Sequence, residues 1–267
     1  MNRMIVWITA LVLLFLPISR SESNAGFTKV DEESYFTWTR DDMRMCPSPE
    51  CGGFYVKALN RLWTRCEDGS KAADCQVLQL DFSLLDMGEN EQAVFQQAFT
   101  VGLGIIKGKL FQAHQDGILF PSLMIQEAWL AQAGKDPGGS KGFFTVHDTG
   151  IQCITAPCPT VDEGLINLPG NRFIAGVDLS TSGAQAEQIN DGYQEMKTGF
   201  IIATGQHEIV HGPAGFSQIL VAGEFYLPVK KVETCGNTLC PPGQTCCNSS
   251  CGICASPGEA CIQIACD

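Results

Sequence analysis

The sequence predicts a β-rich α+β protein in which one unit is duplicated with pseudo-two-fold symmetry and a small disulfide-rich module follows. Three observations support this fold class. Short apolar runs bounded by Gly and Pro recur along the chain, a Cys-x4-Cys motif occurs twice, and eight of the 14 cysteines lie between Cys235 and Cys266. The expected organisation is a signal peptide (1–25), a first copy (26–133), a linker (134–142), a second copy (143–231) and a cysteine-rich module (232–267).

Residues 1–25 are expected to be a secretory signal peptide. Arg3 precedes an uncharged, apolar stretch from Met4 to Ile18, and Ser23-Asn24-Ala25 offers small residues at a cleavage site. The stretch is shorter than the roughly 20 residues that span a bilayer, and no later segment is apolar enough to do so. A secreted or cell-surface location follows, with retention of the segment as an anchor as the alternative.

The charge and the cysteines narrow the possible partners. The formal net charge is −12, and such an acidic chain repels phosphate, so we expect no nucleic-acid partner.

All cysteines follow the signal segment, and on an exported chain an even number of them predicts disulfides. We expect bonds at Cys46, Cys51, Cys66, Cys75, Cys153, Cys158, Cys235, Cys240, Cys246, Cys247, Cys251, Cys254, Cys261 and Cys266. Asn248 begins a glycosylation sequon, which matters in a eukaryotic host.

The duplication is visible by aligning Tyr35–Asn60 with Phe143–Asn167. Each segment contains Cys-x4-Cys with proline inside, and an asparagine follows the second cysteine by nine positions. Further on, Asp81 and Glu127 are 46 positions apart, as are Asp178 and Glu224. Several equal intervals in the same order indicate an internal repeat.

An insertion distinguishes the first copy. "LWTRCEDGSKAADC" adds ten residues and brings both Cys66 and Cys75. The simplest pairing therefore joins these two cysteines to each other and closes each Cys-x4-Cys on itself. Pairing between the copies remains open, because connectivity does not follow from sequence.

The apolar periodicity predicts the elements. Alternation over Leu78–Leu84 is typical of a half-buried strand, and Glu91–Phe99 is the clearest helix, with Ala184–Ile189 as a shorter counterpart. Further strands are expected at 53–59, 103–111, 123–130, 200–204 and 219–227. Gly and Pro in "AQAGKDPGGSKG" predict the linker.

The paired motifs resemble a known family. "CPSPECGGFYVKALNR", "CEDGS", "IQCITAPCPT", "LIN" and "FYLPV" look like a secreted domain-of-unknown-function family that is frequent in myxobacteria. The resemblance covers about residues 34–229. It implies secretion and the duplicated unit, and it implies no activity or catalytic residue.

The tail is similar to a different class of module. "CPPGQTCC" and "CGIC" resemble granulin or whey-acidic-protein type cysteine-rich modules. A segment this small buries little apolar surface, so disulfides are expected to hold it. Cys251-x2-Cys254 has the spacing of zinc ligands, and the exported context favours bridges over a metal.

One motif suggests an enzyme. His207-Glu208-x-x-His211 has the spelling of a zinc-protease helix. Gly205 precedes it and Gly212-Pro213 follows it, which leaves too little helix to hold two ligands. If the segment is extended, positions i and i+4 lie roughly 13 Å apart, too far for one ion. We place the segment in the connection between the last two strands, and we expect no metal, with His207 and His211 as the weak candidates.

Other paired residues have structural explanations. Asp81 and Asp178, like Glu127 and Glu224, are expected to cap turns or face solvent, with a symmetric carboxylate pair as the alternative. Asn60 and Asn167 are expected to fix a turn through side-chain bonds to the backbone.

These observations favour a secreted, disulfide-stabilised protein that has no catalytic activity or cofactor and binds another protein or a surface glycan. Two alternatives remain. A zinc metalloprotease would depend on His207, Glu208 and His211. A protease inhibitor would use the proline-containing Cys-x4-Cys loops, since a preorganised loop loses little entropy on binding.

Overall fold

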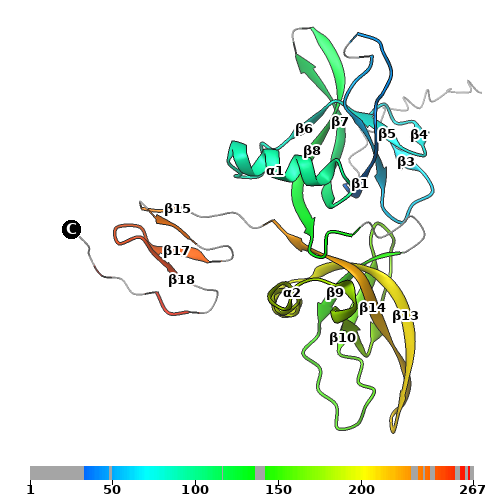
Figure 1. Ribbon diagram of the computed structural model, residues 1–267, viewed down its shortest axis with the longest axis vertical. Helices are drawn as coiled ribbons and strands as arrows, with labels where there is room; N and C mark the ends of the chain where they lie inside the picture. The colour runs from blue at the N-terminus through cyan, green and yellow to red at the C-terminus, as the bar shows by residue number, and fades with distance from the viewer. Residues whose placement is uncertain are drawn as a thin grey trace, which may run out of the picture.

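The computed structural model describes residues 33–47, 50–115, 117–135, 142–229, 234–236, 238–240, 244–255, 259–261 and 264. The predicted signal peptide and residues 136–141 of the predicted linker lie outside this part of the chain. Figure 1 shows two lobes, one above the other in this view, with the strands of the cysteine-rich tail beside them. We call residues 33–135 the first half and residues 142–229 the second half.

The first half is a sheet that wraps around its own core. Its strands are β1 (Ser34–Asp41), β2 (Phe54–Ala58), β3 (Thr64–Arg65), β4 (Lys71–Ala72), β5 (Cys75–Val77), β6 (Gln79–Asp81), β7 (Gly104–Gln115) and β8 (Ile118–Ala131), and its helix is α1 (Glu89–Phe99). β1 pairs with β2 and β7, β2 pairs with β5, and β7 pairs with β8, all antiparallel. β6 pairs with β8 in parallel. Because β6 follows β5 directly in the chain, the paired strands form a closed ring in the order β1, β2, β5, β6, β8 and β7.

The second half contains strands β9 (Phe143–Asp148), β10 (Val161–Leu165), β11 (Asn171–Ile174), β12 (Gly176–Asp178), β13 (Ile201–Gly212) and β14 (Gly215–Pro228), with a 3-10 turn η1 (Ser180–Ser182) and helix α2 (Ala186–Thr198). β9 pairs with β10 and β13, β10 with β11, and β13 with β14, while β12 pairs with β14 in parallel. These strands also form a closed ring, in the order β9, β10, β11, β12, β14 and β13, because β12 follows β11 directly in the chain.

Each long hairpin bends at a glycine. The register shifts between Lys107 and Gly108 in β7 and between Thr204 and Gly205 in β13. A Cβ atom on Gly108 would collide with the carbonyl oxygen of Met124, and a Cβ on Gly205 would collide with that of Val221. The bulges therefore require glycine at both positions.

The two halves are joined by strand pairing and by a shared apolar seam. Tyr226 of β14 lies opposite Ala131 of β8, and the pairing continues to Pro228 and Trp129. The seam cluster consists of Leu59, Ile105, Trp129, Ile166, Ile202 and Tyr226, all buried. Each half also has its own core, in which Phe95 and Phe99 of α1 and Met196 of α2 are buried.

The structure corrects several predicted boundaries. The strands predicted at 103–111, 123–130 and 219–227 span 104–115, 118–131 and 215–228. The strand predicted to reach Leu84 ends at Asp81, whose carboxylate accepts a hydrogen bond from the Ser83 amide and starts a turn. The strand predicted at 200–204 continues to Gly212. The predicted short helix at 184–189 is α2, which is longer than α1, with 13 residues against 11.

The sequence does not indicate the full length of α2, because Gly192 interrupts its apolar pattern. A glycine inside a helix normally lowers helix propensity. Here a Cβ at Gly192 would crowd Leu179 and Phe225, so glycine allows the helix to pack closely on the sheet.

The tail consists of two small hairpins. β15 (Thr234–Cys235) pairs with β16 (Thr238–Leu239), and β17 (Thr245–Asn248) pairs with β18 (Ile253–Ala255).

Candidate functional site

The His207-Glu208-x-x-His211 segment is part of strand β13. His207 lies opposite Leu220 of β14, and His211 lies opposite Phe216. The prediction that the segment connects the last two strands is therefore wrong, because the hairpin turn comes only after Gly212. The one-turn helical spacing on which a zinc-protease site depends is absent from this strand.

His207 belongs to a polar cluster with Glu163 and Arg172, in which the Glu163 carboxylate is buried and the Arg172 side chain is 48% exposed. The Glu163 side chain is 1% exposed; its Oε2 accepts a 2.6 Å hydrogen bond from Arg172 Nε, and its Oε1 lies 2.7 Å from His207 Nε2. Arg172 Nη2 also lies 2.7 Å from His207 Nε2. A ring nitrogen donates when protonated and accepts when not, so Nε2 bonds either Glu163 or Arg172. Arg172 Nη1 donates to Gln218, which ties β11 to β14.

The fold does not require charge at these positions. By strand register, Val56, Cys75 and Leu110 occupy in the first half the places that Glu163, Arg172 and His207 occupy in the second. All three first-half residues are buried and apolar. Because burying a carboxylate is costly, the cluster is a specific feature of the second half.

Glu208 and His211 do not join this cluster. Both are exposed residues of β13. The structure thus separates the three residues of the motif instead of converging them on one point.

The Cys153–Cys158 bridge closes an exposed loop next to the β13–β14 hairpin. Ile154 in this loop is fully exposed, at 104% of its reference area. The Ala214 amide donates a 2.9 Å hydrogen bond to the Ala156 carbonyl, which fixes the loop to the hairpin turn. The Ala156-Pro157 peptide bond is cis. The corresponding first-half loop is closed by the Cys46–Cys51 bridge.

Asn60 and Asn167 adopt the left-handed conformation and bind the opposite half. Asn60 Nδ2 donates to the carbonyls of Phe143 and Ile166, and its Oδ1 accepts from the Phe143 amide. Asn167 makes the reciprocal bonds to the amide and carbonyl of Tyr35 and to the carbonyl of Leu59. The predicted bonds to the backbone are present, and they cross the seam.

Asp81 and Asp178 each cap a turn. The amides of Ser83 and Ser180 donate to the respective carboxylates at 2.9 Å. These bonds match the structural interpretation of the aspartates, and each carboxylate serves its own turn.

The paired glutamates differ. Glu224 is fully buried and accepts backbone hydrogen bonds from Gln132, Ala133, Lys135 and Phe225. Glu127 forms a 2.6 Å ion pair with Lys107. Glu224 thus anchors the start of the predicted linker, and Glu127 neutralises a lysine.

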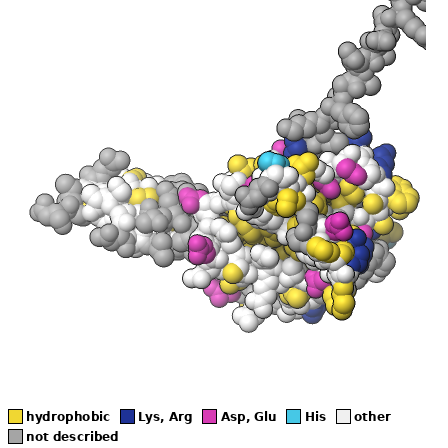
Figure 2. Space-filling view, turned by 90° about the horizontal axis from the view of Figure 1, so that it is seen from above, with side chains coloured by type: hydrophobic (Ala, Val, Ile, Leu, Met, Phe, Trp, Pro, Cys, Tyr) yellow, Lys and Arg dark blue, Asp and Glu magenta, His cyan; other side chains and the backbone are white. Residues whose placement is uncertain are grey.

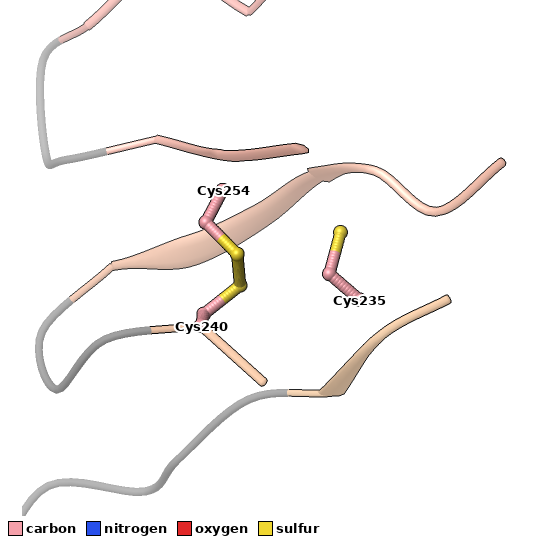
Figure 3. Close-up of side chains that lie close together, drawn as sticks. All are labelled: Cys235, Cys240 and Cys254. Carbon is pink, nitrogen blue, oxygen red and sulfur yellow. A yellow bond between two sulfur atoms is a disulfide. The ribbon is translucent and has the colours of Figure 1, made fainter. Parts of the chain in front are cut away.

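The tail cysteines are bonded to one another. Bridges join Cys235 to Cys246, Cys240 to Cys254, and Cys247 to Cys261, and Cys66 pairs with Cys75 in the first half, as the sequence indicated. Cys251 is disulfide-bonded as well, and Cys266 lies outside the described residues. The Sγ atoms of Cys235, Cys240 and Cys254 lie within 4.8 Å of one another, as the sulfur ligands of a metal ion do. Figure 3 shows the disulfide between two of them, and a disulfide sulfur is not a thiolate ligand.

Sequence reasoning missed Glu163 and Arg172. A signal was present, because "VDEGLIN" places a glutamate at an inward position of an alternating strand, where the first copy has "FYVKALN". Comparing inward positions between the two aligned segments would have identified it.

The site and fold define a β-rich, disulfide-stabilised protein, consistent with an extracellular location. Residues 34–232 match the model of a domain of unknown function, DUF6748, so the chain belongs to this family. No curated protein and no solved structure matches the chain. Within the described ranges, no helix has the length and apolar character needed to cross a membrane.

Proposed function

We propose that the protein is secreted, has no catalytic activity and binds another protein through one end of its second half. We define this binding end as loop 150–158 together with hairpin residues 207–216. A surface glycan is the alternative ligand.

The observation that carries this proposal is the display of large apolar side chains on a fixed scaffold. Ile154 is fully exposed, Phe216 is 77% exposed and Ile209 is 61% exposed. The Ala214–Ala156 hydrogen bond joins the loop and the hairpin that carry them. Exposed apolar groups held in place lose little entropy on binding and are typical of protein interfaces.

The geometry around His207 supports a non-catalytic role. His207 Nε2 lies 2.7 Å from both Glu163 Oε1 and Arg172 Nη2, and His211 lies four residues further along an extended strand. Two imidazoles at that spacing do not share an ion bound at about 2 Å from each nitrogen. A zinc protease would require this strand to rearrange.

The two halves also support a proposal about origin, in which one unit was duplicated and the copies are related by a pseudo-two-fold axis. The order of strand pairing, the parallel β6–β8 and β12–β14 contacts and the glycine bulges recur in each half. The likeness of the tail to granulin-type modules, and cleavage of residues 1–25, stay proposals of the same kind.

The binding proposal is tested with the full chain, produced in an oxidising compartment and used as bait in cross-linking against extracellular proteins of its source. Phe216→Ser should reduce capture of the cross-linked partner at least tenfold. Leu119→Ser is the matched control, since Leu119 holds the same register position in the first hairpin and is 57% exposed. Equal loss in both variants, or capture only of glycans, would contradict a protein-binding site in the second half.

A further inference from the structure

We infer that loop 153–158 is a substrate-like inhibitory loop for a secreted serine protease, and that Ile154 is the residue that enters the primary specificity pocket of the protease. This inference rests on the proposed function, because it places the partner at the binding end defined above. It names the class of partner and the residue that selects it.

The main chain around Ile154 is free to pair with another chain. Among the described residues, the backbone groups of residues 152–155 make no hydrogen bond. Residues 151–156 are all exposed. A protease binds its substrate as an added extended strand, through main-chain hydrogen bonds and alternate side-chain pockets, so free backbone and an exposed side chain are the two features that it needs.

The loop is fixed at its bridge and at Ala156, while the backbone of residues 152–155 is free of hydrogen bonds to other described residues. The Cys153–Cys158 bridge closes it, the Ala156 carbonyl accepts the Ala214 amide at 2.9 Å, and the Thr149 amide donates to the Thr160 carbonyl at 2.9 Å. Thr160 Oγ1 in turn donates to the Ala175 carbonyl. A loop held in this way loses little conformational entropy when it binds in the cleft of a protease, and it keeps its conformation while it is bound. Inhibition needs only reversible occupancy, with no bond made or broken.

The first-half loop differs from the second at the position after its first cysteine. Pro47 follows Cys46, in the position that Ile154 holds after Cys153, and proline has no backbone N–H to donate. The Arg44 side chain also donates a hydrogen bond to the Glu50 carbonyl, so this backbone group near the second cysteine of the loop is already bonded. These differences between the described residues favour the second loop as the inhibitory one.

The side chain of residue 154 determines which protease is bound. Isoleucine suits a small aliphatic pocket such as that of elastase, whereas trypsin requires lysine or arginine. The decisive variant is Ile154→Lys, which moves the expected target from elastase to trypsin. A misfolded variant would not acquire a new inhibitory activity, so inhibition of trypsin by Ile154→Lys would support the inference.

The experiment measures inhibition of elastase, trypsin and chymotrypsin by the full chain, by Ile154→Lys and by the control Met45→Lys, which alters an equally exposed residue beside the other bridge. The unaltered chain should inhibit elastase. Ile154→Lys should weaken that inhibition by about 30-fold or more, the size of a hot-spot effect, and should inhibit trypsin, while Met45→Lys should behave like the unaltered chain.

Two results would overturn the inference. In one, the unaltered chain inhibits none of the three enzymes and Ile154→Lys gains nothing against trypsin. In the other, the chain is cleaved after residue 154 as fast as an unstructured peptide of the same sequence. If Ile154→Lys loses its cross-linked partner but affects no protease, the inhibitor inference fails and the binding function stands.

Discussion

Asn60 and Asn167 form a reciprocal pair of clamps across the seam between the two halves. Asn60 Nδ2 donates to the Phe143 carbonyl at 2.7 Å, and Asn167 Nδ2 donates to the Tyr35 carbonyl at 2.8 Å. Both asparagines have positive φ angles, 57° and 62°. Asparagine tolerates this conformation and carries both a donor and an acceptor, so no other common residue replaces it fully here.

The clamp predicts a graded loss of stability. Asn60→Gly keeps the backbone conformation and removes three hydrogen bonds to the backbone, which should cost about 2–3 kcal/mol. Asn60→Ala should cost about 1 kcal/mol more, because alanine is strained at positive φ. Urea unfolding of both variants measures the difference. Equal stability of the glycine variant and the unaltered chain would show that the hydrogen bonds contribute nothing net.

The cluster around the buried Glu163 carboxylate predicts that replacing all three of its residues lowers the free energy of unfolding less than replacing Arg172 alone. Arg172→Val leaves the buried Glu163 carboxylate with a single ionisable partner and should cost about 1–2 kcal/mol, less than for a fully buried pair because the Arg172 side chain is 48% exposed. The triple variant Glu163→Val, Arg172→Val and His207→Leu makes the site apolar, as its first-half counterpart is. Its free energy of unfolding should lie within about 1 kcal/mol of the unaltered value or above it.

The triple variant also separates stability from function. If the cluster only supports the hairpin, partner capture should survive in the triple variant. Unfolding of the triple variant at room temperature would contradict the comparison between the halves, because the first half carries an apolar core at the same register positions.

The sequence predicted the β-rich class, α1 and the pairing of Cys66 with Cys75 because these depend on local periodicity and spacing. It did not predict that β13 extends through His211, since exposed polar residues in a projecting hairpin show no burial pattern. It also did not predict the Glu163–Arg172–His207 cluster. Those residues are 9 to 44 positions apart, and only the closed strand pairing brings them together.

Metal analysis tests the interpretation of the histidine motif. The purified chain should contain no stoichiometric zinc and should hydrolyse no peptide, because His207 and His211 lie on an extended strand and His207 Nε2 lies 2.7 Å from Glu163 and from Arg172. Mass spectrometry under native conditions measures metal content directly. One zinc per chain, lost in both His207→Ala and His211→Ala, would restore the metalloprotease hypothesis.

Because of Tyr35, the free energy of unfolding should decrease at alkaline pH. Burial, followed by the nearby Glu127 carboxylate, raises the pKa of Tyr35 above its ordinary value. An ordinary tyrosine has a pKa near 10. Above about that pH the unfolded chain releases the Tyr35 proton while the folded chain keeps it, so stability is full below pH 10 and declines as pH rises through the folded pKa.

The variant Tyr35→Phe removes this dependence. Unfolding free energies measured between pH 9 and pH 11 should fall less steeply for the variant, by up to about 1.4 kcal/mol per pH unit, which corresponds to one proton. Tyr193→Phe is the control, because Tyr193 is 36% exposed and lies on α2. Parallel pH profiles for the unaltered chain and Tyr35→Phe would contradict the assignment.

Disulfide reduction should separate the tail from the two halves. The large apolar side chains of the buried clusters all belong to the first and second halves, whereas the buried apolar residues described in the tail are Cys235 and Cys240. A segment without an apolar core depends on its bridges for stability. Mild reduction should therefore make the tail susceptible to proteolysis while the fragment ending near Val229 stays folded.

The expected products follow from where each half obtains its stability. The two halves have their own cores, the shared seam and the Asn60–Asn167 clamps, none of which requires a tail disulfide. Losing the Cys66–Cys75 bridge should cost the first half about 2–3 kcal/mol, as expected for a loop of this length, which is less than the stability of a typical domain. Limited proteolysis with mass spectrometry, with and without reductant, identifies the fragments. Simultaneous digestion of the tail and both halves would show that the bridges in the halves, and not their cores, hold the fold together.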